Sequence, residues 1–167
     1  TSGEYFLVEN RQQQMFDAGL PGSGLLIWHV DTAQTTNRNQ CYPGGPSCST
    51  QHFKVALVQA DNLYELEKKI DKGDTGDSFP GSTNKVTFDG SSHPNINHYS
   101  GTPSVYCVTS IGASGTTMTA TLSSSCLLPD DTTPPTTTAS PAGGTYIEAM
   151  SVTLTCSDNY SCDKTYY

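Results

Sequence analysis

Apolar positions along the chain gather in short runs that are separated by turn-forming residues. Residues 4–10 are rich in aromatic and β-branched types, which is typical of a β-strand. Residues 24–30 are apolar at consecutive positions up to His29, as expected of a central strand that is covered on both faces. Residues 53–60 predict a further strand, so the first 60 residues are expected to supply three strands.

The remainder of this region predicts a hairpin and one helix. Residues 104–111 and 116–122 are β-type runs that a Gly-containing turn connects. A short helix is expected after the third strand, with Asp61 as its N-cap and Gly73 at its end. Its apolar face is formed by Leu63, Leu66 and Ile70. Short strands, Gly- and Pro-rich turns and the lack of a strand–helix–strand rhythm predict an all-β fold, a jelly-roll-like β-sandwich with one short helix.

The composition changes near residue 129, which predicts a domain boundary. Residues 1–128 are expected to form the sandwich domain, and residues 129–138 are a stiff Pro- and Thr-rich linker. Residues 139–167 begin a second β module, in which 151–156 alternate between apolar and polar positions. A segment of this length cannot bury a core alone, so we expect this second β module to be truncated and the chain to be a fragment of a longer protein.

The overall balance of residues excludes several classes of protein. Only 34% of the 167 residues are apolar and 14% are charged, with 15 Gly and 10 Pro, which suits a turn-rich β protein better than a helical bundle. The net charge is -8 and the eight Lys and Arg residues are scattered, which argues against nucleic-acid binding. The longest apolar run, 25–28, is too short to span a bilayer.

The even number of cysteines predicts an oxidised, secreted or extracellular protein. Their spacing favours three local disulfides among fifteen arithmetically allowed pairings. The expected pairs are Cys41 with Cys48, Cys107 with Cys126, and Cys156 with Cys162. Zinc–thiolate coordination is the alternative, and it is disfavoured because the chain has no Cys-x-x-Cys pair.

An acidic, glycine-rich loop at 71–81 is the candidate metal site. Asp71, Asp74 and Asp77 recur at every third position, with Gly73 and Gly76 between them. Calcium prefers carboxylate and carbonyl oxygens from a flexible loop, so this spacing predicts bound calcium. The spacing does not match an EF-hand. A solvated turn, in which the Asp side chains accept local N–H groups, remains open as the alternative.

No catalytic residue is assigned within the chain. Ser78 follows Gly76-Asp77 but lacks the Gly-x-Ser-x-Gly setting of a nucleophile elbow. The four histidines include no His-Glu-x-x-His pair of the kind that zinc peptidases use. His29 lies at the end of an apolar strand close to Asp31, where a hydrogen-bonded structural histidine is expected.

Five blocks of sequence carry a resemblance to a known family. They are 4–12 with 16–31, 58–61 with 63–67, and Gly73-Asp74-Thr75-Gly76-Asp77-Ser78-Phe79-Pro80-Gly81. Together they resemble the region that follows the catalytic domain in immune inhibitor A-like secreted bacterial zinc metallopeptidases. The resemblance implies a sandwich packed against a protease domain, zinc held only in that missing domain, and bound calcium. The tail from 133 to 167 is similar to Ig-like or chitobiase C-terminal-type repeats.

Two functions from different classes are compatible with these patterns. The first is a non-catalytic β-sandwich segment of a secreted zinc metalloendopeptidase, which supports the upstream protease domain and leads into accessory modules. It predicts an apolar docking face on the domain. The alternative is a stand-alone extracellular adhesion or carbohydrate-binding module, which would contact protein or glycan surfaces. A hydrolase that uses Ser78 is a third, weaker hypothesis.

Overall fold

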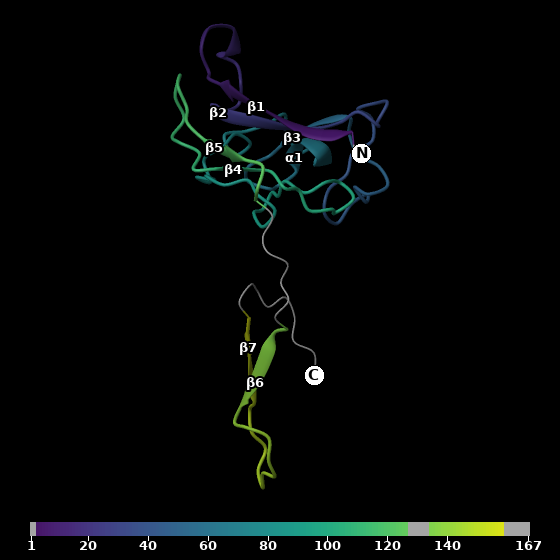
Figure 1. Cartoon of the computed structure of the whole chain (residues 1–167), viewed down its shortest axis with the longest axis vertical. Coiled ribbons are helices and arrows are strands. Elements are labelled where there is room, and N and C mark those ends of the chain that lie inside the picture. Colours follow the sequence, from purple (N-terminus) through teal and green to yellow (C-terminus); the bar gives the residue numbers. More distant parts are fainter. Residues whose placement is uncertain (1–2, 127–133, 159–167) are drawn as a thin grey trace. The chain divides into compact units, whose positions relative to one another are not determined.

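The computed structural model describes residues 3–126 and 134–158 of the chain. They fall into two compact units, Thr1–Leu127 and Leu128–Tyr167, which are called the first unit and the second unit below (Figure 1). In the described ranges no helix is long and apolar enough to cross a membrane.

A three-stranded antiparallel sheet forms one layer of the first unit. It contains β1 (Glu4–Arg11), β2 (Gly24–Asp31) and β3 (Val55–Val58) in that spatial order. A single 3-10 turn, η1 (Met15–Asp17), lies in the connection from β1 to β2. The register places Leu7 opposite Trp28, and Trp28 opposite Leu57. The three predicted strands are therefore confirmed, with β3 shorter at both ends than expected.

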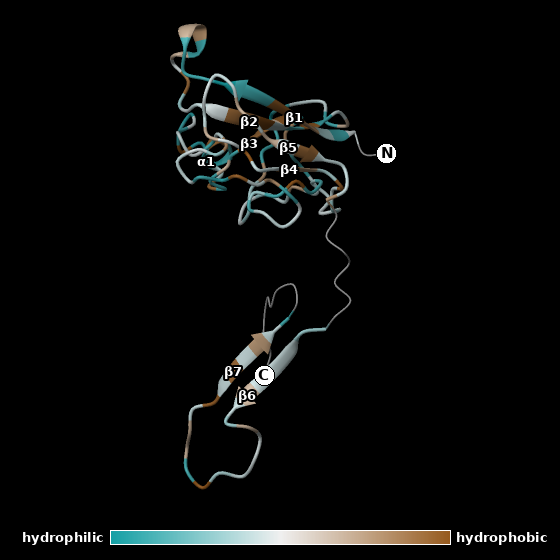
Figure 2. Ribbon diagram, turned by 60° about the vertical axis from the view of Figure 1, so that its left-hand side comes forward, coloured by the Kyte–Doolittle hydropathy of each residue, from teal (hydrophilic) through white to brown (hydrophobic). Residues whose placement is uncertain are grey.

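A two-stranded antiparallel sheet forms the other layer. It pairs β4 (Cys107–Thr109) with β5 (Thr121–Ser123), and Val108 lies opposite Leu122. Phe88 extends this sheet by an isolated antiparallel bridge to Val108. The hydropathy colouring in Figure 2 shows apolar segments on the strands of both layers.

Side chains from both layers meet in one hydrophobic core, which gives the unit its all-β sandwich architecture. The buried members are Leu25, Ile27, Ala60, Phe79, Phe88, Ile96, Val108 and Ile111. The two-residue period of β2 directs Leu25 and Ile27 into this core and the residues between them to the opposite face. Phe88 is fully buried, and its ring lies 5.4 Å from that of Phe6 and 5.7 Å from that of Phe79.

We expect Phe88→Ala to cost about 3–5 kcal/mol of unfolding free energy, because it removes a ring from a close-packed site and leaves a cavity. Urea titration followed by circular dichroism measures the loss. Phe16→Ala is the matched control, since Phe16 is fully exposed in η1 and its loss should change stability by less than about 0.5 kcal/mol. Equal effects of the two substitutions would contradict this placement of the core.

The predicted helix is real but its boundaries and its apolar face are wrong. Helix α1 spans Glu65–Lys68, a single turn. Asp61 does not cap it: its Oδ1 accepts the N–H of Leu63 in the preceding turn, and the first helical N–H, that of Glu65, is accepted by Gln59 Oε1 at 2.7 Å.

The helix ends at a left-handed Lys69 rather than at Gly73. Leu63 and Ile70 are 51% and 65% exposed, and the buried helical residue is Glu67. One helical turn is too short for residues seven positions apart to share a covered stripe.

In the second unit the structure describes one antiparallel hairpin. It pairs β6 (Thr136–Ser140) with β7 (Thr153–Ser157). Residues 136–138, which the sequence assigned to the linker, belong to β6, because β-branched Thr favours a paired strand as readily as an extended linker. The residues of both strands are exposed except for Cys156, which is half-buried.

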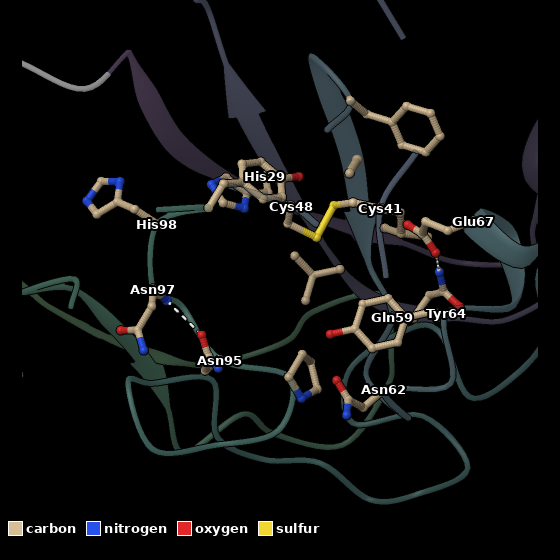
Figure 3. A pocket seen from close by; sticks show the side chains of 16 residues that line it. His29, Cys41, Cys48, Gln59, Asn62, Tyr64, Glu67, Asn95, Asn97 and His98 are labelled. Carbon is tan, nitrogen blue, oxygen red and sulfur yellow. Dashed lines mark hydrogen bonds between the residues drawn. A yellow bond between two sulfur atoms is a disulfide. The ribbon is translucent and has the colours of Figure 1, made fainter. Parts of the chain in front are cut away.

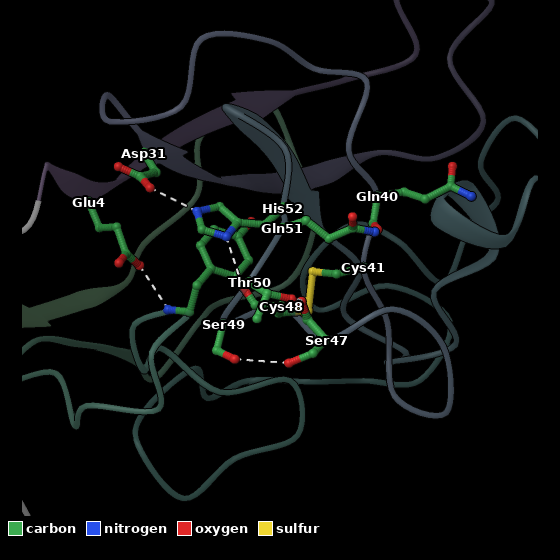
Figure 4. The surroundings of a disulfide bond; sticks show 11 residues. Glu4, Asp31, Gln40, Cys41, Ser47, Cys48, Ser49, Thr50, Gln51 and His52 are labelled. Carbon is green, nitrogen blue, oxygen red and sulfur yellow. Dashed lines mark hydrogen bonds and ion pairs between the residues drawn. A yellow bond between two sulfur atoms is a disulfide. The ribbon is translucent and has the colours of Figure 1, made fainter.

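Two of the three predicted disulfides are confirmed. Cys41 is bonded to Cys48, and Cys107 is bonded to Cys126. Cys156 is also disulfide-bonded, whereas Cys162 lies outside the described residues. The Cys41–Cys48 bridge closes the long polar loop between β2 and β3 (Figure 4).

Candidate functional site

The acidic loop contains two overlapping groups of carboxylates rather than one. Asp74 belongs to both groups, one of which also contains Asp61 and Asp77 and the other Glu65 and Asp71. Within each group the nearest carboxylate oxygens lie within 4.8 Å of one another. The structure thus brings Asp74 close to Asp77 and to Asp71, but neither group joins Asp71 with Asp77.

Local hydrogen bonds give the loop its turns. Asp71 Oδ1 accepts the N–H of Gly73 at 2.8 Å, and Asp77 Oδ2 accepts the N–H of Asp74 at 2.8 Å. Asp74 Oδ1 accepts the N–H of Gly76. These are the contacts that the solvated-turn interpretation predicts. Gly76 lets the two carboxylates approach closely, because a Cβ there would displace Asp61 Oδ2 and crowd Asp74 Oδ1.

The electrostatics of the loop disfavour several ionised carboxylates at once. Asp77 is only 6% exposed. Burial raises the pKa of Asp77 to about 6, and the negative charges of Asp61, Asp74 and Asp71 add to this rise. The hydrogen bond from the Asp74 N–H acts in the opposite direction and lowers the pKa. The pKa of Glu65 is also raised, first by desolvation and then by the same neighbouring aspartates. A divalent cation among these oxygens would relieve both the repulsion and the cost of burial.

Sequence reasoning missed Asp61 and Glu65 as members of these groups. The sequence assigned Asp61 to the N-cap of the helix and gave Glu65 no role. The sequence does show acidic residues just before the loop. Only the fold shows that the chain turns back, so that residues 60–61 lie beside residues 76–77. In that fold the N–H groups of Ala60 and Asp61 are accepted by the carbonyls of Asp77 and Gly76.

A second feature of the first unit is a stack of four rings between the sheet and the loops. Phe6 stacks on His29 with ring centroids 4.2 Å apart, and His29 stacks on Tyr99 at 4.0 Å with the rings nearly parallel. His52 stacks on the other side of Tyr99 at 3.8 Å. The stack joins β1 and β2 to the loop that ends at residue 53 and to the loop around residue 99.

Each histidine in the stack is hydrogen-bonded to a buried carboxylate. His29 Nε2 lies 2.9 Å from Glu4 Oε2, and the same oxygen accepts the N–H of Tyr99 at 2.9 Å. His52 Nε2 lies 2.8 Å from Asp31 Oδ2, while its Nδ1 donates to the carbonyl of Cys48 at 2.7 Å (Figure 4). The expectation of a hydrogen-bonded structural His29 agrees with this geometry, although its partner is Glu4 rather than Asp31.

Burial controls the protonation of the stack. It lowers the pKa of His29 to about 4, although the charge and hydrogen bond of Glu4 oppose the shift. Burial also disfavours the ionised form of Asp31, but hydrogen bonds from His52 and from the Ala33 N–H outweigh it and lower the pKa of that carboxyl. Burial raises the pKa of Tyr99. The arrangement therefore holds a neutral His29 and an ionised Asp31 at neutral pH.

A cavity of about 170 Å³ adjoins the stack (Figure 3). His29, Tyr64, Glu67 and the Cys41–Cys48 disulfide are among the residues that line it. Glu67 is buried, accepts a hydrogen bond from Gln59 Nε2, and has its pKa raised by burial. No serine or threonine is among the lining residues, and both lining cysteines are oxidised, so the hydroxyl groups of this lining are the phenols of Tyr64 and Tyr99, and the cavity offers no thiolate.

Ser78 lies away from that cavity and has a structural role. It is 1% exposed, and its Oγ donates to the carbonyl of Ser23 at 3.1 Å. A nucleophilic serine needs a histidine as base at this position, and the Ser78 hydroxyl is bound to a backbone carbonyl instead.

The outer face of the three-stranded sheet is largely apolar, and is called the outer face below. Its apolar part is formed by Tyr5, Leu7, Leu26, Trp28, Val55 and Leu57, which alternate with core-facing residues along the strands, and Glu9 and Arg11 continue the same face at the end of β1. Tyr5 and Leu7 are 45% and 52% exposed. A hollow of about 500 Å³ lies between this face and the acidic loop, with Trp28 on one side of its lining and Asp74 and Asp77 on the other. Trp28 Nε1 donates to Glu9 Oε1 at 2.9 Å, which fixes the indole ring on this face.

Comparison of the chain with protein-family models, with curated proteins and with solved structures found no match.

Proposed function

We propose that this chain is a non-catalytic β-sandwich segment of a secreted zinc metalloendopeptidase, which supports an adjacent protease domain and links it to accessory modules. The observation that carries the proposal is the outer face. A contiguous apolar surface on a β-sheet, with aromatic and aliphatic side chains exposed, is the feature that protein interfaces need and that isolated domains rarely present.

The chemistry of the site agrees with a supporting role. The buried histidines are bonded to Glu4 and Asp31 and lie inside a ring stack, where they hold loops against the sheet. In the proposed enzyme, zinc belongs to the adjacent domain, and none of the residues described here is assigned as its ligand. The two described disulfides are compatible with an extracellular location.

We also propose calcium as a structural ligand of the acidic loop. The three carboxylates of Asp61, Asp74 and Asp77 lie close enough to share one ion, since calcium–oxygen distances of about 2.3–2.6 Å place ligand oxygens up to about 5 Å apart. The ion would supply positive charge to a partly buried acidic group and tie the loop to residue 61. It has no role in bond cleavage.

The test of the supporting role uses the parent polypeptide. We expect its gene to encode a His-Glu-x-x-His motif upstream of residue 1. Leu7→Asp on the outer face should lower the melting temperature of the protease domain and increase its autolysis, because a charge cannot be buried in an apolar contact. Ile70→Asp is the matched control, since Ile70 is also exposed but is neither a residue of the outer face nor one that lines the hollow over it.

Two results would overturn the supporting role. One is a parent gene without the zinc motif, and the other is an isolated chain that hydrolyses casein. Retention of the isolated chain on a glycan array, together with an unaffected Leu7→Asp variant, would favour the adhesion or carbohydrate-binding module instead.

A further inference from the structure

The two sheets of the first unit leave a groove between their edge strands. β1 is the terminal strand of its sheet, and β5 is a terminal strand of the other. A groove of about 520 Å³ lies between them, with β1 residues Phe6 and Val8 on one wall and β5 residue Leu122 on the other. Phe6 and Val8 lie on the core side of the sheet, and Tyr5 is the one lining residue that the groove shares with the outer face.

Leu122 shows that the sandwich is open along this groove. Residues directly opposite in an antiparallel pair point to the same face, so Leu122 points to the same side as its partner Val108. Val108 is 4% exposed, whereas Leu122 is 68% exposed. Tyr106, which also lines the groove, is 57% exposed. A core-facing leucine is therefore left uncovered by the described residues of the first unit.

The backbone of β1 also faces the groove. The Thr32 N–H donates to the Gly3 carbonyl at 3.1 Å, which fixes the phase of the ladder between β1 and β2. Odd-numbered residues of β1 thus bond to β2, and Phe6 and Val8 direct their N–H and C=O groups away from it. No described residue bonds to these outward groups of Phe6 or Val8.

We propose that this groove binds an extended polypeptide segment, supplied from outside these 167 residues, which pairs with β1 and covers Leu122. Only an extended backbone offers donors and acceptors at the spacing that Phe6 and Val8 present. Glu4 is the one carboxylate among the residues that line the groove, and its Oε2 already accepts the Tyr99 N–H and lies 2.9 Å from His29 Nε2, so it is not available to pair with a cation of an incoming segment. The segment that complements it is uncharged, with apolar side chains at alternate positions.

The groove is closed at the end of β1, which limits the length of the segment that can bind. At the end of β1 the Asn10 side chain donates to the carbonyls of Gly115 and Thr116, so the loop there closes the path beyond residue 10. A strand of about five to seven residues fits the remaining edge. The inference does not depend on the proposed protease, because it uses neither the outer face nor the acidic loop.

The experiment measures binding of the full chain to an immobilised library of short, uncharged peptides with Val, Leu, Ile or Phe at alternate positions and Thr between them. We expect saturable binding of a subset. N-methylation of one alternate set of backbone nitrogens should abolish binding, and methylation of the other set should leave it within about twofold, because only one set faces β1.

Protein variants test the same contact from the other side. Val8→Pro removes an N–H that faces the groove without removing a bond to β2, and it should weaken binding about tenfold or more. Leu122→Ser should weaken it as well, while Ile70→Ser, an equally exposed site elsewhere, should not. If Val8→Pro does not fold, the methylated peptides and Leu122→Ser decide the question.

Three outcomes would overturn the inference: no saturable binding by any peptide, equal effects of the two methylation patterns, or undiminished binding by both groove variants. Sedimentation of the unliganded chain provides a further check. A dimer that Val8→Pro converts to a monomer would mean that a second copy fills the groove, and the proposed occupant would be wrong.

Discussion

Lowering the pH from 7 to 4 should remove roughly 3 kcal/mol of folding free energy from the first unit through His29. The pKa of this histidine is about 4 in the folded protein, against 6.5 for an unperturbed side chain. As the pH falls below 6.5 the unfolded chain takes up the proton first. The contribution of His29 is therefore complete above pH 6.5 and is lost progressively as the pH falls to 4.

Urea unfolding at a series of pH values measures this loss, and His29→Phe isolates it. Phenylalanine keeps a ring between Phe6 and Tyr99, so the stack survives while the titrating group is removed. The difference in stability between the two proteins should shrink as the pH falls. His93→Phe serves as the control, because His93 is exposed. Parallel pH profiles for wild type and His29→Phe would show that folding does not lower the pKa of His29 and would contradict this account.

Calcium at about 100 times its dissociation constant should stabilise the first unit by about 2.7 kcal/mol and raise its melting temperature by about 10 °C. Calorimetry in calcium and in excess chelator measures the shift. Asp74→Ala should abolish it, because Asp74 belongs to both carboxylate groups. An identical melting curve in calcium and in chelator would remove calcium from the account of this loop.

Two further variants distinguish the carboxylate groups. Asp61→Asn should abolish the calcium shift if the ion lies with Asp74 and Asp77, and Asp71→Asn should leave most of it. The reverse result would place the ion with Glu65 and Asp71. The two substitutions are matched, since each removes one charge from one group and keeps the shape of the side chain.

The sequence predicted those features that depend on neighbours along the chain. The strand-forming residues of 4–10 and 24–30 and the short separations within two cysteine pairs are local signals, and the structure agrees with each. The predicted pairing of the two later strands is also present, but β4 and β5 have three residues each and the connection runs over 110–120 rather than turning tightly at 112–115. The length of the helix could not be predicted, because the apolar pattern over Leu63–Ile70 is compatible with one helical turn or with several. Only the position of Lys69, in the left-handed region, ends it early.

The candidate sites depended on long-range register and could not be predicted in the same way. Glu4 reaches His29 because β1 and β2 pair antiparallel with Phe6 opposite His29. Tyr99 enters the same stack from a loop seventy residues further along the chain. Asp61 meets Asp74 because the backbone at 60–61 bonds to that at 76–77. Contacts between residues so far apart in the sequence cannot be predicted from the pattern of any one segment.

The position of Trp28 makes it a useful intrinsic fluorescence probe. It is the only tryptophan of the 167 residues, it is half-buried in the middle of β2, and its indole N–H is held by Glu9. Intrinsic fluorescence excited at the indole band therefore reports on one surface of one sheet. A blue shift on adding another domain would signal dehydration of that surface, whereas a strand that pairs with β1 on the opposite side should leave the emission maximum nearly unchanged.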